Sequence, residues 1–221
     1  MTMSLPPGEP AVEHWDAAGR AEFVDLVRKA GGSPAARPQI VAVDGRGAAG
    51  KSTLATWLHE AAPASAILHT DDLAWNEPFF AWGHLLLQVL QQLHRGEPVH
   101  LRPPAWCEHG RQGEIHLPAG LDLVVVEGVG ASQREHADLI DTTVWVQSDF
   151  DEAERRGIAR DIAQGVNGDH QETVAFWHEW MSHELSFVEQ QRPWERAALV
   201  VAGTTVLPLE PGQVAVSPGP L

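Results

Sequence analysis

The eight residues from Gly45 to Ser52, GRGAAGKS, constrain the fold of this chain more than any other feature. A short apolar run, IVAV, precedes them, and apolar residues at helical spacing follow them as far as Leu58. Glycines let backbone N–H groups turn inward and approach an anion closely, and the N-terminus of a helix favours negative charge. The stretch therefore predicts a strand, a phosphate-binding loop and a helix, in that order.

The side chains of this loop predict a site for ATP and Mg²⁺. Lys51 is placed to reach the β- and γ-phosphates, and the Ser52 hydroxyl is placed to bind Mg²⁺. The chain has only two lysines, and one of them stands at the position that the motif requires. The residues predicted to hold the nucleotide are Gly45, Gly47, Ala48, Ala49, Gly50, Lys51, Ser52 and Thr53.

The composition is that of a globular, acidic protein. Of the 221 residues, 43% are hydrophobic and 20% are charged, which is enough apolar material for one sizeable domain. The formal net charge of -15 argues against a nucleic-acid partner or an anionic membrane surface, and no apolar run is long enough to span a bilayer. The single cysteine, Cys107, allows no internal disulfide, so we expect a cytoplasmic protein. The sequence leaves a homodimer open.

Short apolar strands alternate with helices along the chain, which indicates an α/β fold. Because continuous apolar strands are typical of parallel sheets, we predict a mostly parallel five-stranded sheet covered by helices on both faces, with ligands at the carboxyl ends of the strands. Strands are expected at 39–44, 66–68, 121–126, 143–146 and 199–201. Helices are expected at 11–30, 51–62, 79–95, 150–164 and 169–190, and a small hairpin at 98–117.

These elements predict one central domain with two flanking segments. Residues 1–37 are expected to form an N-terminal extension, disordered as far as residue 10, and residues 208–221 a loose Pro/Gly-rich tail. The domain proper spans 38–207 and contains an insert at 75–117, on the side of the phosphoryl acceptor, and a lid at 150–168.

Two carboxylates, Asp71 and Asp72, directly follow the second predicted strand. A kinase that acts on an alcohol needs a carboxylate to accept the hydroxyl proton while the phosphoryl group transfers. Asp is also a frequent helix N-cap. We therefore predict that one of the pair is the base, while the other caps a helix or orders metal-bound water.

Glu127 ends the most apolar strand of the chain. A carboxylate at such a strand end commonly helps to hold Mg²⁺, although most of these sites use Asp. The alternative is a solvated loop residue. The predicted metal ligands are thus Ser52 and Glu127, directly or through water, and Asp72 is a further candidate through metal-bound water.

Arg156 and Arg160 lie four residues apart, on one face of a predicted helix. Arginines on a mobile lid can close over ATP and neutralise charge that develops on the transferred phosphoryl group. The alternative is ion pairing with the acidic residues around them. Arg155 lies about 100° away on the helix and is expected at the surface.

These motifs together resemble the uridine kinase-like branch of the P-loop kinases, which includes the nicotinamide riboside kinases. The stretch LHTDD is similar to the family segment in which an Asp after the second strand serves as base, which selects Asp71. VVVEG resembles the family strand whose Glu assists Mg²⁺, and RRGIARD resembles its lid arginines. The resemblance covers about residues 38–202 and implies the P-loop kinase fold.

The acceptor side resembles the family less closely. RPPAWCEHGR, residues 102–111, is similar to the segment that contacts the nucleobase, which implies Trp106, His109 and Arg111 as substrate contacts, and we expect Trp75 and Trp82 as further walls. Three departures stand out: Phe79 and Phe80 occupy the region of a ribose-binding Asp, Cys107 replaces another Asp, and the lid has one extra residue.

The resemblance implies an ATP-dependent phosphotransferase that passes the γ-phosphoryl group to a hydroxyl of a nucleoside or nucleoside-like small molecule. The expected catalytic residues are Lys51, Asp71, Arg156 and Arg160. Two alternatives stay open: an antibiotic-modifying kinase resembling chloramphenicol phosphotransferase, and a non-catalytic ATP-binding regulator. The twelve histidines predict no metal site, because no pair has usable ligand spacing in the sequence.

Overall fold

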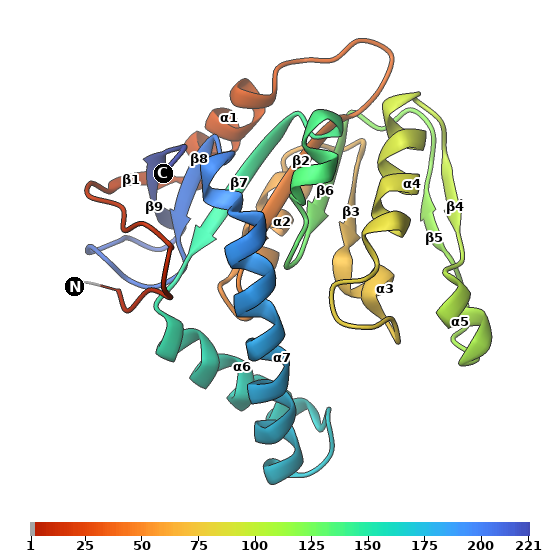
Figure 1. Cartoon of the computed structure of the whole chain (residues 1–221). Helices are drawn as coiled ribbons and strands as arrows, with labels where there is room; N and C mark the ends of the chain where they lie inside the picture. The colour runs from red at the N-terminus through yellow and green to blue at the C-terminus, as the bar shows by residue number, and fades with distance from the viewer. Residues whose placement is uncertain (1–2) are drawn as a thin grey trace.

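One mixed sheet of seven strands forms the centre of the molecule (Figure 1). The structure is a computed structural model and describes residues 3–221. The strands lie in the order β1-β9-β8-β7-β2-β6-β3. Their bounds are β1 Asp16–Gly19, β2 Gln39–Gly45, β3 Ser65–His69, β6 Leu123–Glu127, β7 Thr142–Gln147, β8 Leu199–Ala202 and β9 Gln213–Pro218.

The five strands expected from the sequence form the parallel part of this sheet, which confirms the mostly parallel α/β architecture. The sheet is nevertheless wider than predicted. β9 pairs antiparallel with β8, and β1 pairs antiparallel with β9. The tail after residue 207 is therefore not loose, because its prolines and glycines bracket a strand instead of preventing one. The helix expected at 11–30 begins only at Arg20, because residues 16–19 form the edge strand.

Helices cover both faces of the sheet, as predicted (Figure 1). Alternate residues of β2 point to opposite faces. Ile40 and Ala42 pack in the core beneath α4 (Gly83–His94), and Val41 and Val43 pack in the core beneath α1 (Arg20–Gly31) and α2 (Lys51–Glu60). The α6–α7 pair extends past the edge where the parallel strands end. The helices are α1 Arg20–Gly31, α2 Lys51–Glu60, α3 Thr70–Ala74, α4 Gly83–His94, α5 Pro104–Glu108, α6 Phe150–Gln164 and α7 His170–Gln191, with 3-10 helices η1 Arg134–Leu139 and η2 Pro193–Glu195.

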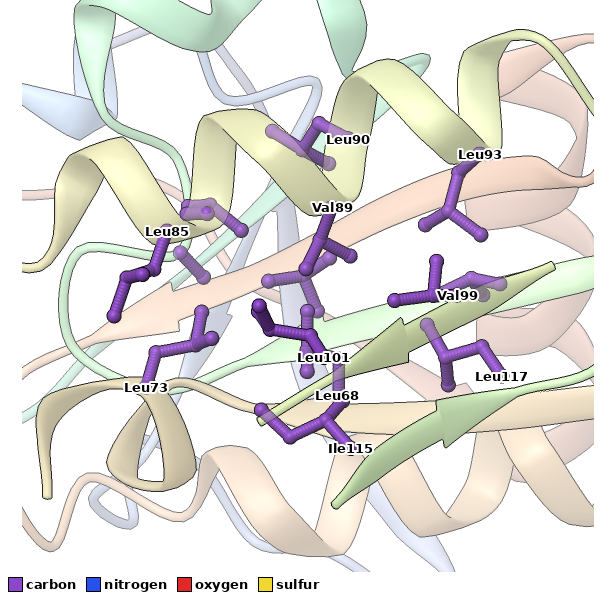
Figure 2. Packing of buried hydrophobic residues seen from close by; sticks show 14 of the residues in the cluster. Leu68, Leu73, Leu85, Val89, Leu90, Leu93, Val99, Leu101, Ile115 and Leu117 are labelled. Carbon is purple, nitrogen blue, oxygen red and sulfur yellow. The ribbon is translucent and has the colours of Figure 1, made fainter. Parts of the chain in front are cut away.

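The hairpin expected at 98–117 is present as a separate two-stranded antiparallel sheet. Its strands, β4 Val99–Leu101 and β5 Ile115–Leu117, are joined by a segment that contains α5. The apolar residues of both strands point inward and pack beneath α4 (Figure 2). The two histidines at the middle positions therefore point away from the core.

The N-terminal segment is ordered from residue 3 onward and lies against the end of the sheet, so the expectation of disorder up to residue 10 is wrong for residues 3–10 and lies outside the described residues for 1–2. The carboxylate of Glu9 is buried and accepts hydrogen bonds from Trp145 Nε1 at 2.9 Å and Gln147 Nε2 at 3.2 Å.

Within residues 3–221, none of the helices combines the length and the apolar character that crossing a bilayer requires.

Candidate active site

The loop between β2 and α2 has the backbone that its sequence predicts. Gly50 precedes the first turn of α2 with φ of +101°, a conformation that an L side chain rarely adopts. No side chain caps the helix at this residue. The first N–H groups of α2, which have no acceptor within the helix, therefore remain available to an anion.

A cavity of about 540 Å³ opens over this loop and holds most of the residues predicted to act on phosphate. It lies where β2, β3 and β6 end and where α6 and α7 project past the sheet, so the topology places ligands at the carboxyl ends of the strands. Its lining residues are Gly47, Ala48, Ala49, Gly50, Lys51, Ser52, Thr53, Asp71, Glu127, Gly128, Val129, Arg156, Arg160, Asp161, Phe176, Trp177 and Trp180. Gly45 is the one predicted nucleotide-binding residue that does not line it.

Lys51 is buried, and its ammonium group is held within the loop itself. Its Nζ donates a hydrogen bond to the backbone oxygen of Arg46 at 2.8 Å. The amine therefore points back along the loop that lines the cavity, which is the place of a phosphate-binding lysine.

Ser52 and Glu127 lie side by side in the lining of the cavity. The Ser52 hydroxyl donates to Glu127 Oε1 at 3.2 Å, because β6 runs beside β2 with Glu127 in register with Val43. A hydroxyl and a carboxylate are oxygen ligands of the kind that Mg²⁺ prefers, so the pair fits that ion.

The ionisation of Glu127 is set by its neighbours. His69, in register with it on β3, shares a hydrogen bond between Nδ1 and Glu127 Oε2 at 2.8 Å. Burial alone would raise the pKa of Glu127, but the hydrogen bond to His69 and the charge of Lys51 outweigh burial and lower the pKa. The same hydrogen bond to Glu127 raises the pKa of His69. Glu127 is thus an anion at neutral pH, as a metal ligand must be.

The adjacent carboxylates Asp71 and Asp72 point to different places. Asp71 is exposed and lines the cavity, which is the position expected of a base. Asp72 lies outside the cavity lining, and its Oδ1 accepts from Arg111 NH2 at 2.5 Å. This ion pair argues against the predicted role of Asp72 beside Mg²⁺, because its carboxylate faces the acceptor-side insert instead of Ser52 and Glu127.

Both lid arginines line the cavity, and both also contact neighbouring protein groups. Arg156 NH1 donates to Gly203 O at 2.8 Å and lies 3.5 Å from Glu152, while its Nε and NH2 are buried without a hydrogen-bond partner among the described residues. Arg160 Nε donates to Asp161 Oδ1 at 2.8 Å. Ion pairing with neighbouring acids is therefore present, as the alternative reading expected, but it leaves guanidinium N–H groups of Arg156 free.

The residues predicted to contact the acceptor do not line the cavity. They form a cluster beside it. The Arg111 guanidinium lies 3.7 Å from the centre of the Trp106 ring and 5.4 Å from that of Trp75, and the His109 ring lies 6.1 Å from Trp75. None of these side chains lines the cavity. Trp82 is only 2% exposed and belongs to the core beneath α4, so its assignment as a wall is wrong.

The aromatic wall of the cavity comes from α7, which sequence reasoning placed but did not connect to the site. Phe176, Trp177 and Trp180 line the cavity. A Cβ atom on Gly47 would lie 2.6 Å from the Trp180 ring, so the indole packs directly on the loop backbone. The available signal was periodicity, since buried residues recur along α7 at Thr173, Trp177, Met181, Glu184 and Val188.

Glu184 and Arg46 are further loop contacts that the motif does not reveal. The Gly47 N–H donates to Glu184 Oε1 at 2.7 Å. The buried Arg46 guanidinium lies between two carboxylates, with Nε 3.2 Å from Glu9 Oε2 and NH1 4.0 Å from Glu184 Oε2. The loop is therefore held from both sides, by the N-terminal segment and by α7.

We expect Glu184→Gln to stabilise the protein at pH 8 much more than at pH 5. Burial raises the pKa of Glu184 to about 7, against the partly compensating charge of Arg46, from an ordinary value of 4.5. Between these values the unfolded chain releases a proton that the folded protein retains, so the free energy of unfolding falls as the pH rises. Glutamine avoids this loss of stability, which is worth up to about 3 kcal/mol, and its side-chain oxygen can still accept the hydrogen bond from the Gly47 N–H.

Urea unfolding of both proteins at pH 5 and pH 8 measures the difference. Glu184→Ala is the matched control, because it also removes the charge but leaves the Gly47 N–H without its acceptor. A stability difference between wild type and Glu184→Gln that is equal at the two pH values would contradict a raised pKa.

The chain has distant relatives among the uridine kinases. It is 30% identical over 91 residues to a uridine kinase of Macrococcus caseolyticus, an alignment that covers 41% of this chain and 44% of that protein. It is 25% identical over 146 residues to a uridine kinase of Clostridium novyi, covering 58% of this chain and 70% of that protein. The chain thus aligns with less than half the length of the first of these relatives. No protein-family model matches the chain.

Solved structures of small-molecule kinases share its fold. A proposed fructose transport system kinase of Silicibacter sp. TM1040 superposes with a TM-score of 0.55 at 17% identity, over 79% of this chain and 94% of the other. A D-glycerate 3-kinase of Cryptococcus neoformans var. grubii gives 0.56 at 13% identity, over 83% and 92%. At such identities the likeness concerns the fold alone, which is that of the P-loop kinases.

Proposed function

We propose that this chain, a distant homologue of uridine kinases with the fold of P-loop small-molecule kinases, transfers the γ-phosphoryl group of ATP to a hydroxyl of a nucleoside or nucleoside-like small molecule. The observation that carries the proposal is that Lys51, the Ser52–Glu127 pair, Asp71 and both lid arginines meet in one cavity. Binding of ATP without transfer does not need a carboxylate at the position of Asp71, so its presence favours a kinase over a regulator.

Each group has a defined part in the proposed reaction. The uncapped N–H groups of α2 and the Lys51 ammonium bind the phosphate oxygens, with Nζ leaving the Arg46 carbonyl to do so. The acceptor oxygen forms a bond to the γ-phosphorus while the bond between this phosphorus and the bridging oxygen breaks, and Asp71 accepts the hydroxyl proton. Mg²⁺, held by Ser52 and Glu127, would neutralise charge on the phosphate oxygens.

The lid arginines of α6 supply further positive charge. Arg156 Nε and NH2 are buried and have no hydrogen-bond partner among residues 3–221, so a rotation that turns them toward the transferring group breaks no hydrogen bond that these two atoms make. Arg160 holds its position through Asp161, whose other oxygen accepts from Trp177 Nε1 at 2.7 Å. The indole of α7 thereby ties the lid helix to the wall of the cavity.

The acceptor should be a molecule with a flat or apolar body. Phe79 and Phe80, which replace a ribose-binding Asp of the family, pack against α7: Phe79 lies 4.8 Å from the His183 ring, and Phe80 stacks on Phe187 at 4.3 Å. The cavity itself is walled by Phe176, Trp177 and Trp180. Rings of this kind bind by stacking and burial instead of hydrogen bonding to a diol.

The test of the function is a screen of nucleosides, cyclic alcohols and aromatic alcohols for a phosphorylated product, with ATP and Mg²⁺ and with Lys51→Ala as the blank. We expect a product with at least one acceptor and less than about a 200-fold difference in kcat/KM between a ribonucleoside and its deoxy form, because apolar sites discriminate hydroxyl groups weakly. A preference for uridine over deoxyuridine of about 10⁴ would show that a hydrogen-bonding diol site exists. Failure to form any product would favour the regulator.

A further inference from the structure

The outer face of the β4–β5 hairpin gathers three metal-ligating side chains that do not line the nucleotide cavity. His100 on β4 and His116 on β5 are direct cross-strand partners. Glu114, two residues before His116, lies on the same side of its chain. We propose that His100, Glu114 and His116 form a binding site for Zn²⁺ or a divalent transition-metal ion of similar ligand preference.

The distances suit a single small ion. His100 Nδ1 lies 3.0 Å and His116 Nδ1 lies 3.9 Å from Glu114 Oε1, and one ligand atom from each of the three residues lies within 4.8 Å of the others. Zinc bonds of about 2.0–2.2 Å in a tetrahedral site place ligand atoms roughly 3.3–3.6 Å apart. Rotation of exposed side chains closes the remaining difference, and no change in the strands is needed.

The chemistry of the three groups selects the ion. Two imidazoles and one carboxylate are a donor set typical of zinc sites that keep a fourth position for water. Mg²⁺ prefers oxygen ligands in an octahedral arrangement, so the ion of the proposed phosphoryl transfer would not compete here. The side chains are 53%, 46% and 50% exposed for His100, Glu114 and His116, which leaves an open path for the ion.

The hairpin packs on the core beneath this face. Val99, Leu101, Ile115 and Leu117 anchor it to the core on the opposite side (Figure 2). The two imidazole rings meet edge-on with centres 4.3 Å apart, so the rings are already adjacent before any ion binds. Since β4 and β5 have three residues each, a bound ion would tie together the two ends of the segment that carries Trp106 and Arg111.

Calorimetric titration of the tag-free full chain with Zn²⁺, without nucleotide, tests the site. We expect one ion per chain. The double variant His100→Gln/His116→Gln should bind the ion at least about a hundredfold more weakly, because mutating a residue that only hydrogen-bonds to a metal ligand already lowers metal affinity 10–100-fold. The matched control is His84→Gln/His94→Gln, which removes two exposed histidines of α4 and should bind like wild type. The same titration with Mg²⁺ should give no site that depends on His100 and His116.

Cobalt supplies a readout of coordination that is independent of activity. Co²⁺ should give visible absorption bands in wild type and in the α4 control, and Glu114→Gln, which keeps both rings, should weaken them. Thermal unfolding in EDTA should be equal for all variants, since the altered side chains are exposed. Absence of zinc binding by wild type, or binding that survives His100→Gln/His116→Gln, would overturn the proposal.

Discussion

Lys51→Ala should lower the rate of phosphoryl transfer at least about a hundredfold, because it removes a charge aimed at the transferring group. Lys51 is buried in the loop, and the other cationic side chains that line the cavity belong to the lid. Arg46, the other cation of the loop, is held between Glu9 and Glu184 and does not line the cavity, so it does not replace the lost ammonium group.

The measurement is kcat at saturating ATP and Mg²⁺ with the best acceptor from the screen. Lys29→Ala is the matched control, because it removes the only other lysine, which lies exposed on α1. Lys51→Met should show the same loss while keeping the length of the side chain, which separates lost charge from altered packing. Unchanged turnover in both Lys51 variants would mean that this loop is not the nucleotide site.

Asp71→Asn should lower kcat by roughly a hundredfold or more and leave nucleotide affinity nearly intact. The substitution keeps the shape of the side chain and removes the proton acceptor. Asp71 lines the cavity, while the neighbouring Asp72 is held by Arg111 beside Trp106. We therefore expect substitution of Asp71 and substitution of Asp72 to have different kinetic effects.

Asp72→Asn is the matched control, since it makes the same chemical change one residue away. It should leave kcat near the wild-type value and raise KM for the acceptor, because it weakens the hold on Arg111 in the acceptor-side cluster. Both variants are compared at saturating Mg²⁺, with ATP affinity measured separately. If Asp72→Asn loses kcat while Asp71→Asn does not, the base is the other carboxylate. If neither loses rate, the protein is not a kinase of this design.

The sequence alone determined the phosphate-binding loop and the strands that carry the site. The loop is a local feature: eight consecutive residues specify its glycine conformations, its lysine and the start of α2. The central parallel strands are similarly readable, because β2, β6 and β7 are short runs buried on both faces. From these two features it follows that Asp71 and Glu127, at strand ends, lie near Lys51.

Only the tertiary structure decided which distant groups complete the site. Glu184 reaches Gly47 across 137 residues, and Glu9 reaches Arg46 across 37, and no local pattern encodes either contact. Trp82 was indistinguishable in sequence from a wall residue, yet its place on the inner face at the start of α4 buries it. His100 and His116 are 16 positions apart and show no ligand spacing, but antiparallel pairing makes them neighbours. Spacing along the chain reports proximity only within one helix, strand or turn; beyond that, the register between strands and the packing of helices on the sheet decide which side chains meet.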